Sequence, residues 1–204
     1  PSLLIAKIAN ILLYMGILLL SYLTARRLFV SEFVGRFTLL VLSFYPNHIA
    51  YCSLLASEIL FLFLLMLGIA LLISEGWKLW CAFASGVSFG LACLVKPQTL
   101  FLPAVLVLLS RKSLGRRIAS IGALYVALGI TMFPWIARNY KVFGRFVFVS
   151  TNGGINLLIG NNPYANGTYG VNDWIYSAVG SPKDESDADF RAVSYTHLTL
   201  PTKA

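Results

Sequence analysis

Charged residues are scarce in this chain, and their scarcity excludes most classes of protein. Only 12% of the 204 residues are charged, whereas soluble domains carry about 25%. So few charges could not cover the surface of a compact soluble domain. The hydrophobic content of 58% in turn excludes a disordered chain. The remaining class is an integral membrane protein.

Cysteine, histidine and the common nucleotide-binding motifs are also sparse. The three cysteines, Cys52, Cys81 and Cys93, form no CxxC pair, and we interpret them as small hydrophobic residues of helices. His48 has no second His or Cys at a metal-ligand spacing. No Walker or GxGxxG motif occurs. The sequence therefore gives no support for a cofactor or a divalent metal.

Acidic residues are half as frequent as basic ones, with 8 Asp and Glu against 16 Lys and Arg. In a polar protein this excess of positive charge would suggest nucleic acid as a partner. Here the basic residues flank apolar runs, so membrane topology explains them more simply. We therefore expect no nucleic-acid partner.

Long apolar runs are what the chain has in abundance. A helix crosses ~30 Å of hydrocarbon with about 20 residues, and the backbone there must satisfy its own hydrogen bonds. The sequence predicts about six such helices, the second bent or broken at Pro46: residues 2–24, 37–55, 59–76, 77–95, 99–110 and 118–135. The expected fold is an all-α polytopic membrane protein.

Basic residues indicate the direction of these helices. Eight of them fall in alternate loops, and therefore on one side of the membrane: Arg26, Arg27, Arg36, Lys78, Arg111, Lys112, Arg116 and Arg117. The positive-inside rule makes that side cytoplasmic. We therefore expect the turn at Lys96 and the segment after Trp135 to be extracytoplasmic, in what we interpret as a bacterial inner membrane.

Composition changes after Trp135, where Gly, Asn, Ser, Pro and Asp become frequent. We expect a transmembrane region over residues 1–136 and the start of a small extracytoplasmic α/β segment over residues 137–191. Within that segment the sequence predicts a strand at Phe146–Ser150 and turns at Asn152–Gly154 and Gly160–Pro163.

The two ends of the sequence differ from those of a complete protein. The first residue is Pro1 and not Met. Residues 192–204 resemble translated sequencing-adapter read-through, and we expect them to be a non-native tail. We therefore expect an internal piece of a longer chain.

Glu58 is a candidate because acids are rare in apolar surroundings. A charge at the bilayer centre costs about 2.5–3.5 kcal/mol, so an acid there usually has a task. One interpretation is that Ser57 and Glu58 merely start a helix, where Glu58 favours the positive end of the dipole. The other places Glu58 at the outer mouth of a cavity, where it binds a sugar hydroxyl or a basic partner.

Lys96 and Arg138 are two further candidates near the same predicted interface. Lys96 lies between two apolar runs, and the second is only about 12 residues, roughly 18 Å at helical rise. Its ammonium either snorkels outward or contacts a lipid phosphate. Arg138 follows Trp135 closely, and it is either an interfacial anchor or a guanidinium that binds a phosphate or pyrophosphate.

Several short motifs follow one another in a distinctive order over residues 5–170. They are Tyr45-Pro46, Ser57-Glu58 before Leu60-Phe61-Leu62, Gly90-Leu-Ala92 with Leu94-Val-Lys-Pro97, Pro134-Trp135 with Arg138-Asn-Tyr140, Phe143-Gly-Arg-Phe146, Ser150-Thr-Asn-Gly-Gly154 and Gly160-Asn-Asn-Pro163. Together they resemble the family 39 glycosyltransferases and their dolichyl-phosphate-mannose mannosyltransferase-like bacterial relatives, which have the GT-C membrane fold.

The resemblance implies transfer of a sugar from a polyprenyl-phosphate carrier to an acceptor glycan, lipid or protein on the extracytoplasmic side. It implies a metal-optional inverting reaction with an Asp as general base, in a loop expected upstream of Pro1. No catalytic residue is therefore assigned in this sequence, and we expect this piece alone to be inactive. Lys96, Arg138 and Glu58 become candidates for lining the donor cavity beside the membrane lipid.

Two alternatives stay open at this point. A multi-pass transporter or lipid-linked glycan flippase would use broken helices around a midplane site, and Pro46 could be such a break. A non-catalytic membrane scaffold would need none of the candidate residues.

Overall fold

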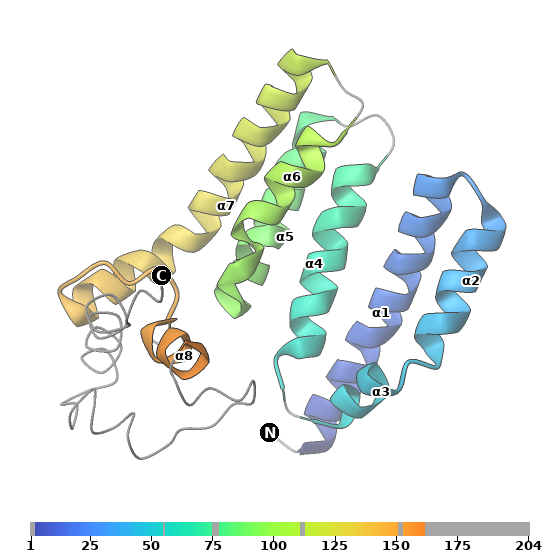
Figure 1. Ribbon diagram of the computed structural model, residues 1–204, viewed down its shortest axis with the longest axis horizontal. Helices are drawn as coiled ribbons and strands as arrows, with labels where there is room; N and C mark the ends of the chain where they lie inside the picture. Colours follow the sequence, from blue (N-terminus) through green and yellow to red (C-terminus); the bar gives the residue numbers. More distant parts are fainter. Residues whose placement is uncertain (1–2, 55, 75–77, 111–112, 151–152, 162–204) are drawn as a thin grey trace, which may run out of the picture. The chain divides into compact units, whose positions relative to one another are not determined.

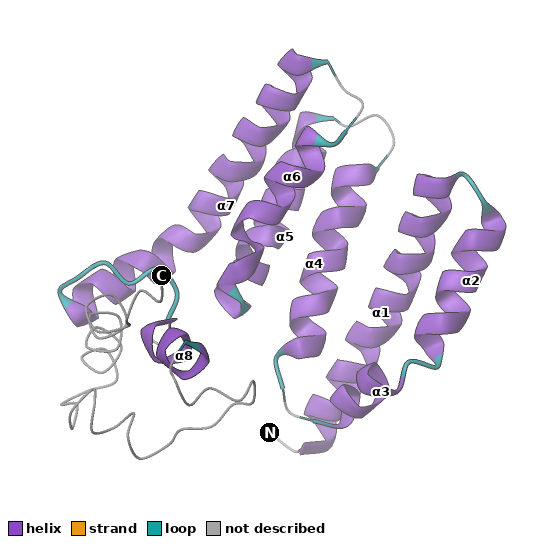
Figure 2. Ribbon diagram, in the orientation of Figure 1, coloured by secondary structure: helices purple, strands orange, loops and turns teal. Residues whose placement is uncertain are grey.

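The structure, a computed structural model, describes residues 3–54, 56–74, 78–110, 113–150 and 153–161. Within these ranges all regular structure is helical (Figures 1 and 2). The helices are α1 (Leu3–Phe29), α2 (Glu32–Ser43), α3 (Pro46–Ser53), α4 (Glu58–Ile73), α5 (Leu79–Val95), the 3-10 helix η1 (Pro97–Phe101), α6 (Leu102–Leu108), α7 (Leu114–Phe143) and α8 (Gly153–Gly160).

Helices α1 to α7 overlap the expected apolar runs, but only two of the described helices have the length and composition to cross a membrane. These are α1, with 27 residues, and α7, with 30 residues. The others are shorter: α4 and α5 have 16 and 17 residues, which at helical rise gives about 24–26 Å. Six full-length spans are therefore not what the described residues show.

The break expected at Pro46 is confirmed. Helix α2 ends at Ser43, and α3 begins at Pro46, which occupies the first turn of the new helix. Tyr45 has an extended backbone with φ −73° and ψ 109°. Proline disfavours the helical conformation of the residue before it and fits the first helical position. Pro46 therefore accounts both for the extended backbone of Tyr45 and for the start of α3.

The chain divides into two compact units, Pro1–Pro134 and Trp135–Ala204. In the first unit α4 packs against both α1 and α5. Glycine permits the close approach of α5 to α7, because a Cβ atom at Gly86 would meet the carbonyl oxygen of Leu124. Buried side chains of α4, α6 and α7 form one cluster of the core: Leu72, Val107 and Leu124.

Neighbouring helices of the first unit run in opposite directions. Figure 1 shows the C-terminal ends of α1, α4 and α6 and the N-terminal ends of α2, α5 and α7 at one end of this unit. The end of α5 and the start of α4 lie at the other end. Arg26, Arg27 and Lys78 thus belong to one end of the unit, and Glu58 and Lys96 belong to the opposite end.

The strand expected over Phe146–Ser150 is wrong. These residues are irregular, and helix α8 (Gly153–Gly160) begins within the first expected turn, Asn152–Gly154, and ends at Gly160, the first residue of the second. The carbonyl oxygens of Val147 and Val149 accept hydrogen bonds from the side-chain amide of Asn139, at 3.3 and 3.5 Å. Side-chain donors therefore take the place of a neighbouring strand. Residues 162–191 and the expected tail at 192–204 lie outside the described residues.

Candidate functional site

Two of the three candidate residues meet at one end of the first unit. Glu58 is the first residue of α4, and Lys96 directly follows the last residue of α5. Because α4 and α5 are antiparallel neighbours, the start of one helix lies beside the end of the other. The Lys96 ammonium nitrogen Nζ donates to Glu58 Oε1 at 3.1 Å, across 38 positions of sequence. Glu58 therefore starts a helix, as one interpretation held, and also has a basic partner, which the other interpretation allowed.

The backbone around Lys96 is held on both sides. Its N–H donates to the carbonyl oxygen of Ala92 at 2.8 Å, which ends α5. Its own carbonyl oxygen accepts from the Thr99 hydroxyl at 3.0 Å, and that hydroxyl lies 3.2 Å from Cys93 Sγ. Pro97 then begins η1. The turn thus fixes where the Lys96 side chain starts.

The Lys96 ammonium also lies over an aromatic ring. Its Nζ is 5.4 Å from the centroid of Phe61, one turn into α4. A cation above a ring face is attracted by the ring quadrupole, most strongly where water is excluded. Here the side chains of Lys96 and Glu58 are 29% and 32% exposed. The pair is neither fully solvated nor sealed in the core, so an incoming anion can reach the ammonium.

This pairing changes the hypothesis for Lys96. The sequence suggested a cation that either snorkels or binds a lipid phosphate, and the structure gives it a carboxylate partner. A phosphate at this place has to share the ammonium with Glu58 or displace that carboxylate. Glu58 therefore becomes a competitor for Lys96.

Arg138 belongs to the second unit and is described with its neighbours there. Its guanidinium carbon Cζ lies 5.0 Å from the ring centroid of Trp135, and its Nη1 donates to Asn139 Oδ1 at 3.1 Å. The Trp135 indole donates to the carbonyl oxygen of Val149 at 3.0 Å. Arg138 thus lies in a network of its own.

Asn139 is a residue that the sequence did not single out. It is only 2% exposed, and its side chain accepts from Arg138 while its amide donates toward the chain after α7. A buried amide with all its partners in place fixes the segment that it holds. Little in the sequence indicated this structural role, because the only distinctive feature of Asn139 is its place in the Arg138-Asn-Tyr140 motif.

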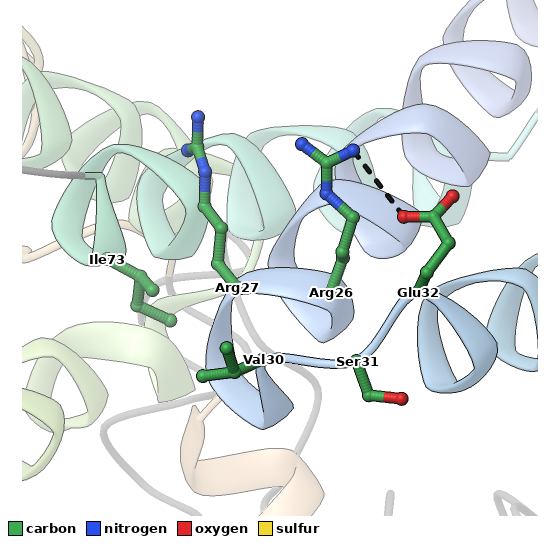
Figure 3. Close-up of a pocket in the computed structure, with 6 residues that line it drawn as sticks. All are labelled: Arg26, Arg27, Val30, Ser31, Glu32 and Ile73. Atoms are coloured by element: carbon green, nitrogen blue, oxygen red, sulfur yellow. Dashed lines mark ion pairs between the residues drawn. The ribbon is translucent and has the colours of Figure 1, made fainter.

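A pocket at the other end of the first unit was also missed (Figure 3). It has a volume of about 630 Å³ and is lined by Arg26, Arg27, Val30, Ser31, Glu32 and Ile73. In the sequence, these arginines stand out only as markers of topology. The spacing of Tyr22 and Arg26 and of Glu32 and Arg36 could have predicted a polar cluster here, because residues four apart face each other on a helix.

Glu32 is the centre of the polar contacts beside this pocket. Its Oε1 accepts from the Tyr22 hydroxyl at 2.7 Å and from Arg36 Nε at 3.2 Å, and its Oε2 lies 3.6 Å from Arg26 Nη1. The Tyr22 hydrogen bond is the main cause that holds the pKa of Glu32 below its ordinary value of 4.5, and the two guanidiniums add to it. Glu32 is therefore ionised at neutral pH.

Among the residues that the structure describes, no three His, Cys, Asp or Glu side chains come together. Comparisons of the chain with protein-family models, with curated proteins and with solved structures find no match. The interpretation of the site therefore depends on its geometry and on the residue patterns of the sequence.

Proposed function

We propose that the protein is a multi-pass membrane glycosyltransferase that moves a sugar from a polyprenyl-phosphate donor to an acceptor on the extracytoplasmic side. The observation that carries this proposal is the contact between Glu58 and Lys96. It joins two separate motifs of the glycosyltransferase resemblance, Ser57-Glu58 and Leu94-Val-Lys-Pro97. The contact lies at the end of the first unit away from the basic loops.

The apolar surface supports the membrane part of the proposal. Only 11% of the most apolar window of α1 is buried inside the protein. Large hydrophobic side chains along this helix are exposed, among them Leu4, Ile11 and Leu19. Water would disfavour so large an apolar surface, whereas lipid accepts it. We propose that α1 and α7 span a bacterial inner membrane and that the shorter apolar helices complete a six-span bundle.

Lys96 is the group best suited to the donor phosphate. A polyprenyl phosphate keeps its chain in lipid and its phosphate at the interface, and the turn at Lys96 is predicted to lie near that interface. When the bond between the sugar and the phosphate oxygen breaks, negative charge develops on the phosphate. A cation already in place stabilises that charge. Glu58 holds the ammonium until the donor arrives, and the general base is the Asp that the resemblance implies.

Arg138 has a second role in this proposal. A guanidinium offers two parallel donors to a phosphate, and that of Arg138 lies over the Trp135 ring. We propose that Arg138 anchors the second unit to lipid phosphates at the extracytoplasmic interface.

One observation favours a transporter or lipid-linked glycan flippase as the second candidate. The run expected over residues 37–55 is interrupted, with α2 and α3 separated at Phe44 and Tyr45. Broken helices line the binding sites of many transporters. The two functions differ in whether the sugar leaves its lipid carrier.

The deciding experiment uses the full-length chain in vesicles with a radiolabelled polyprenyl-phosphate sugar. Transfer of the label to a water-soluble or protein acceptor, abolished in Lys96→Gln, is expected. Label that changes leaflet but stays on its carrier would support the flippase instead. A full-length chain that does neither, while its circular dichroism remains helical, would reject both candidates.

A further inference from the structure

The pocket beside Glu32 lies where α1 ends and α2 begins. Only Val30 and Ser31 connect these helices. The Ser31 N–H donates to the carbonyl oxygen of Arg26 at 3.3 Å, and the Ser31 hydroxyl accepts from the Val34 N–H at 3.4 Å. Ser31 therefore ends one helix and caps the next, so the arginines of α1 are held at a fixed place beside Glu32.

The charges of the described residues around the pocket do not balance. Among these residues Arg26, Arg27 and Arg36 contribute three positive charges, and Glu32 contributes one negative charge, which leaves a net charge of +2. Arg26 and Arg36 both contact Glu32. No carboxylate of the described residues pairs with Arg27, which points away from Glu32 in Figure 3. Within the described part of the chain, the Arg27 guanidinium is therefore available to an anion.

Apolar side chains surround this positive region. Leu28, Phe29 and Val30 at the end of α1 are exposed, as is Phe33 in the first turn of α2. Ile73 of α4 forms an apolar part of the pocket wall. Guanidiniums beside exposed apolar groups at the end of a membrane helix match the level where phosphates meet acyl chains. A soluble anion would need the guanidiniums but not the apolar rim.

We propose that this pocket binds the phosphate of an anionic phospholipid, with Arg27 as its main ligand and Arg26 as a second cation. The glycerol and the first part of the acyl chains then lie against Ile73 and Val30. A phosphate diester suits the fork of a guanidinium, which donates two parallel hydrogen bonds. The site is separate from the Glu58–Lys96 pair, and it holds whether the protein transfers or transports its substrate.

Glu32 also lines the pocket and repels a phosphate, so its position matters. Its two oxygens already face Tyr22, Arg36 and Arg26. These donors, two from α1 and one from α2, offset the charge of the carboxylate, and Figure 3 shows Arg26 between Glu32 and Arg27. The repulsion left over favours a phosphate bound on the Arg27 side of the pocket.

The test measures binding to the full-length chain in phosphatidylcholine nanodiscs that contain a minor fraction of phosphatidylglycerol. Native mass spectrometry then counts the lipids retained by the released protein. One retained phosphatidylglycerol is expected, and Arg27→Gln should weaken its binding by about tenfold. Arg116→Gln removes the same charge from an exposed residue outside the pocket and should change the binding little. Arg27→Lys should be intermediate, because it keeps the charge and loses the fork.

Three results would overturn the proposal. Equal losses in Arg27→Gln and Arg116→Gln would mean that the net charge attracts the lipid without a site. In a competition experiment, glycerol phosphate is added to the nanodiscs before release. If it displaces the retained phosphatidylglycerol as effectively as added lipid does, the ligand is a soluble phosphate. Unchanged retention in Arg27→Gln would remove the assigned ligand. Circular dichroism of each variant shows that the helices are kept, so a loss of binding is not a loss of fold.

Discussion

The Lys96 ammonium lies 3.1 Å from the Glu58 carboxylate, although 38 positions of sequence separate the two residues. Because the two charges have opposite signs, they act in opposite directions on an anion that approaches the pair. Lys96 attracts it, whereas Glu58 repels it and occupies the ammonium. The two residues are therefore a matched pair for testing the proposed phosphate site.

Variants at these two positions should change lipid-phosphate affinity in opposite directions. Lys96→Gln removes the cation and should weaken binding of a polyprenyl phosphate by about tenfold. Glu58→Gln frees the ammonium and should strengthen binding, by up to about fivefold for a partly exposed pair. Fluorescence titration of the full-length chain with a labelled polyprenyl phosphate measures both.

Lys78→Gln is the control for this pair, because Lys78 is an exposed lysine at the opposite end of α5. It should leave the affinity unchanged. Weaker binding in both Glu58→Gln and Lys96→Gln would show that the intact ion pair is needed for structure, against the proposed competition.

Glycine substitutions test the packing of α5 against α7. A Cβ atom at Gly86 would lie 2.9 Å from Ala127 Cβ and would also meet the backbone of Leu124. Gly86→Ala should therefore lower the free energy of unfolding by about 1–3 kcal/mol. Gly122→Ala is the control, because nothing lies within 4 Å of its added Cβ. It should be neutral or stabilising by roughly 0.5–1 kcal/mol, since alanine favours a helix. Unfolding in detergent micelles, followed by circular dichroism, compares the two, and equal losses would contradict the packing.

The order of the helices could be predicted from the sequence because it depends on local properties. Apolar runs set their positions, and Pro46 set the break between α2 and α3. The strand at Phe146–Ser150 could not be judged in this way, because a strand also needs a neighbour with free backbone groups. Here the side chains of Asn139 and Trp135 supply the donors, and no local pattern indicates that.

The candidate site was predictable only in part, for a similar reason. Composition marked Glu58 and Lys96 as unusual charges in apolar surroundings. Lys96 lies in the turn expected for it, and Glu58 starts a helix, as one of its two interpretations held. Their contact depends on the antiparallel packing of α4 and α5, which the sequence does not specify. The pocket at Arg27 depends on three helices at once, and its arginines have the same pattern as ordinary topology markers.

Val30 offers a test of the tight connection between α1 and α2. Its φ of 49° lies in the left-handed region, which a β-branched residue adopts at a cost. It occupies the position after the helix where glycine is preferred, and it is 92% exposed, so little packing is lost on substitution. Val30→Gly should raise the free energy of unfolding by about 1 kcal/mol, because the left-handed penalty exceeds the extra freedom of the unfolded chain. Val30→Ala keeps a Cβ atom and should gain less, and a loss of stability in Val30→Gly would refute this account of the turn.

The acid dependence of stability should report the contacts of Glu32. The hydrogen bond from Tyr22, with the neighbouring guanidiniums, keeps the pKa of Glu32 in the folded protein below its ordinary value of 4.5. The folded state therefore binds this proton more weakly than the unfolded chain. Its contribution to stability is complete above about pH 4.5 and is lost as the pH falls through the lower folded pKa.

Tyr22→Phe removes the main cause of this shift and should move the folded pKa of Glu32 back toward its ordinary value. The variant should be less stable than the original protein above pH 4.5, and the difference should shrink as the solution becomes more acidic. Thermal unfolding across this range measures the difference directly. Tyr140→Phe removes a hydroxyl from an exposed tyrosine of the second unit, so it should give a difference independent of pH. A Tyr22→Phe difference that is the same in acid and at neutral pH would mean that the hydroxyl contributes to stability without acting on the Glu32 proton.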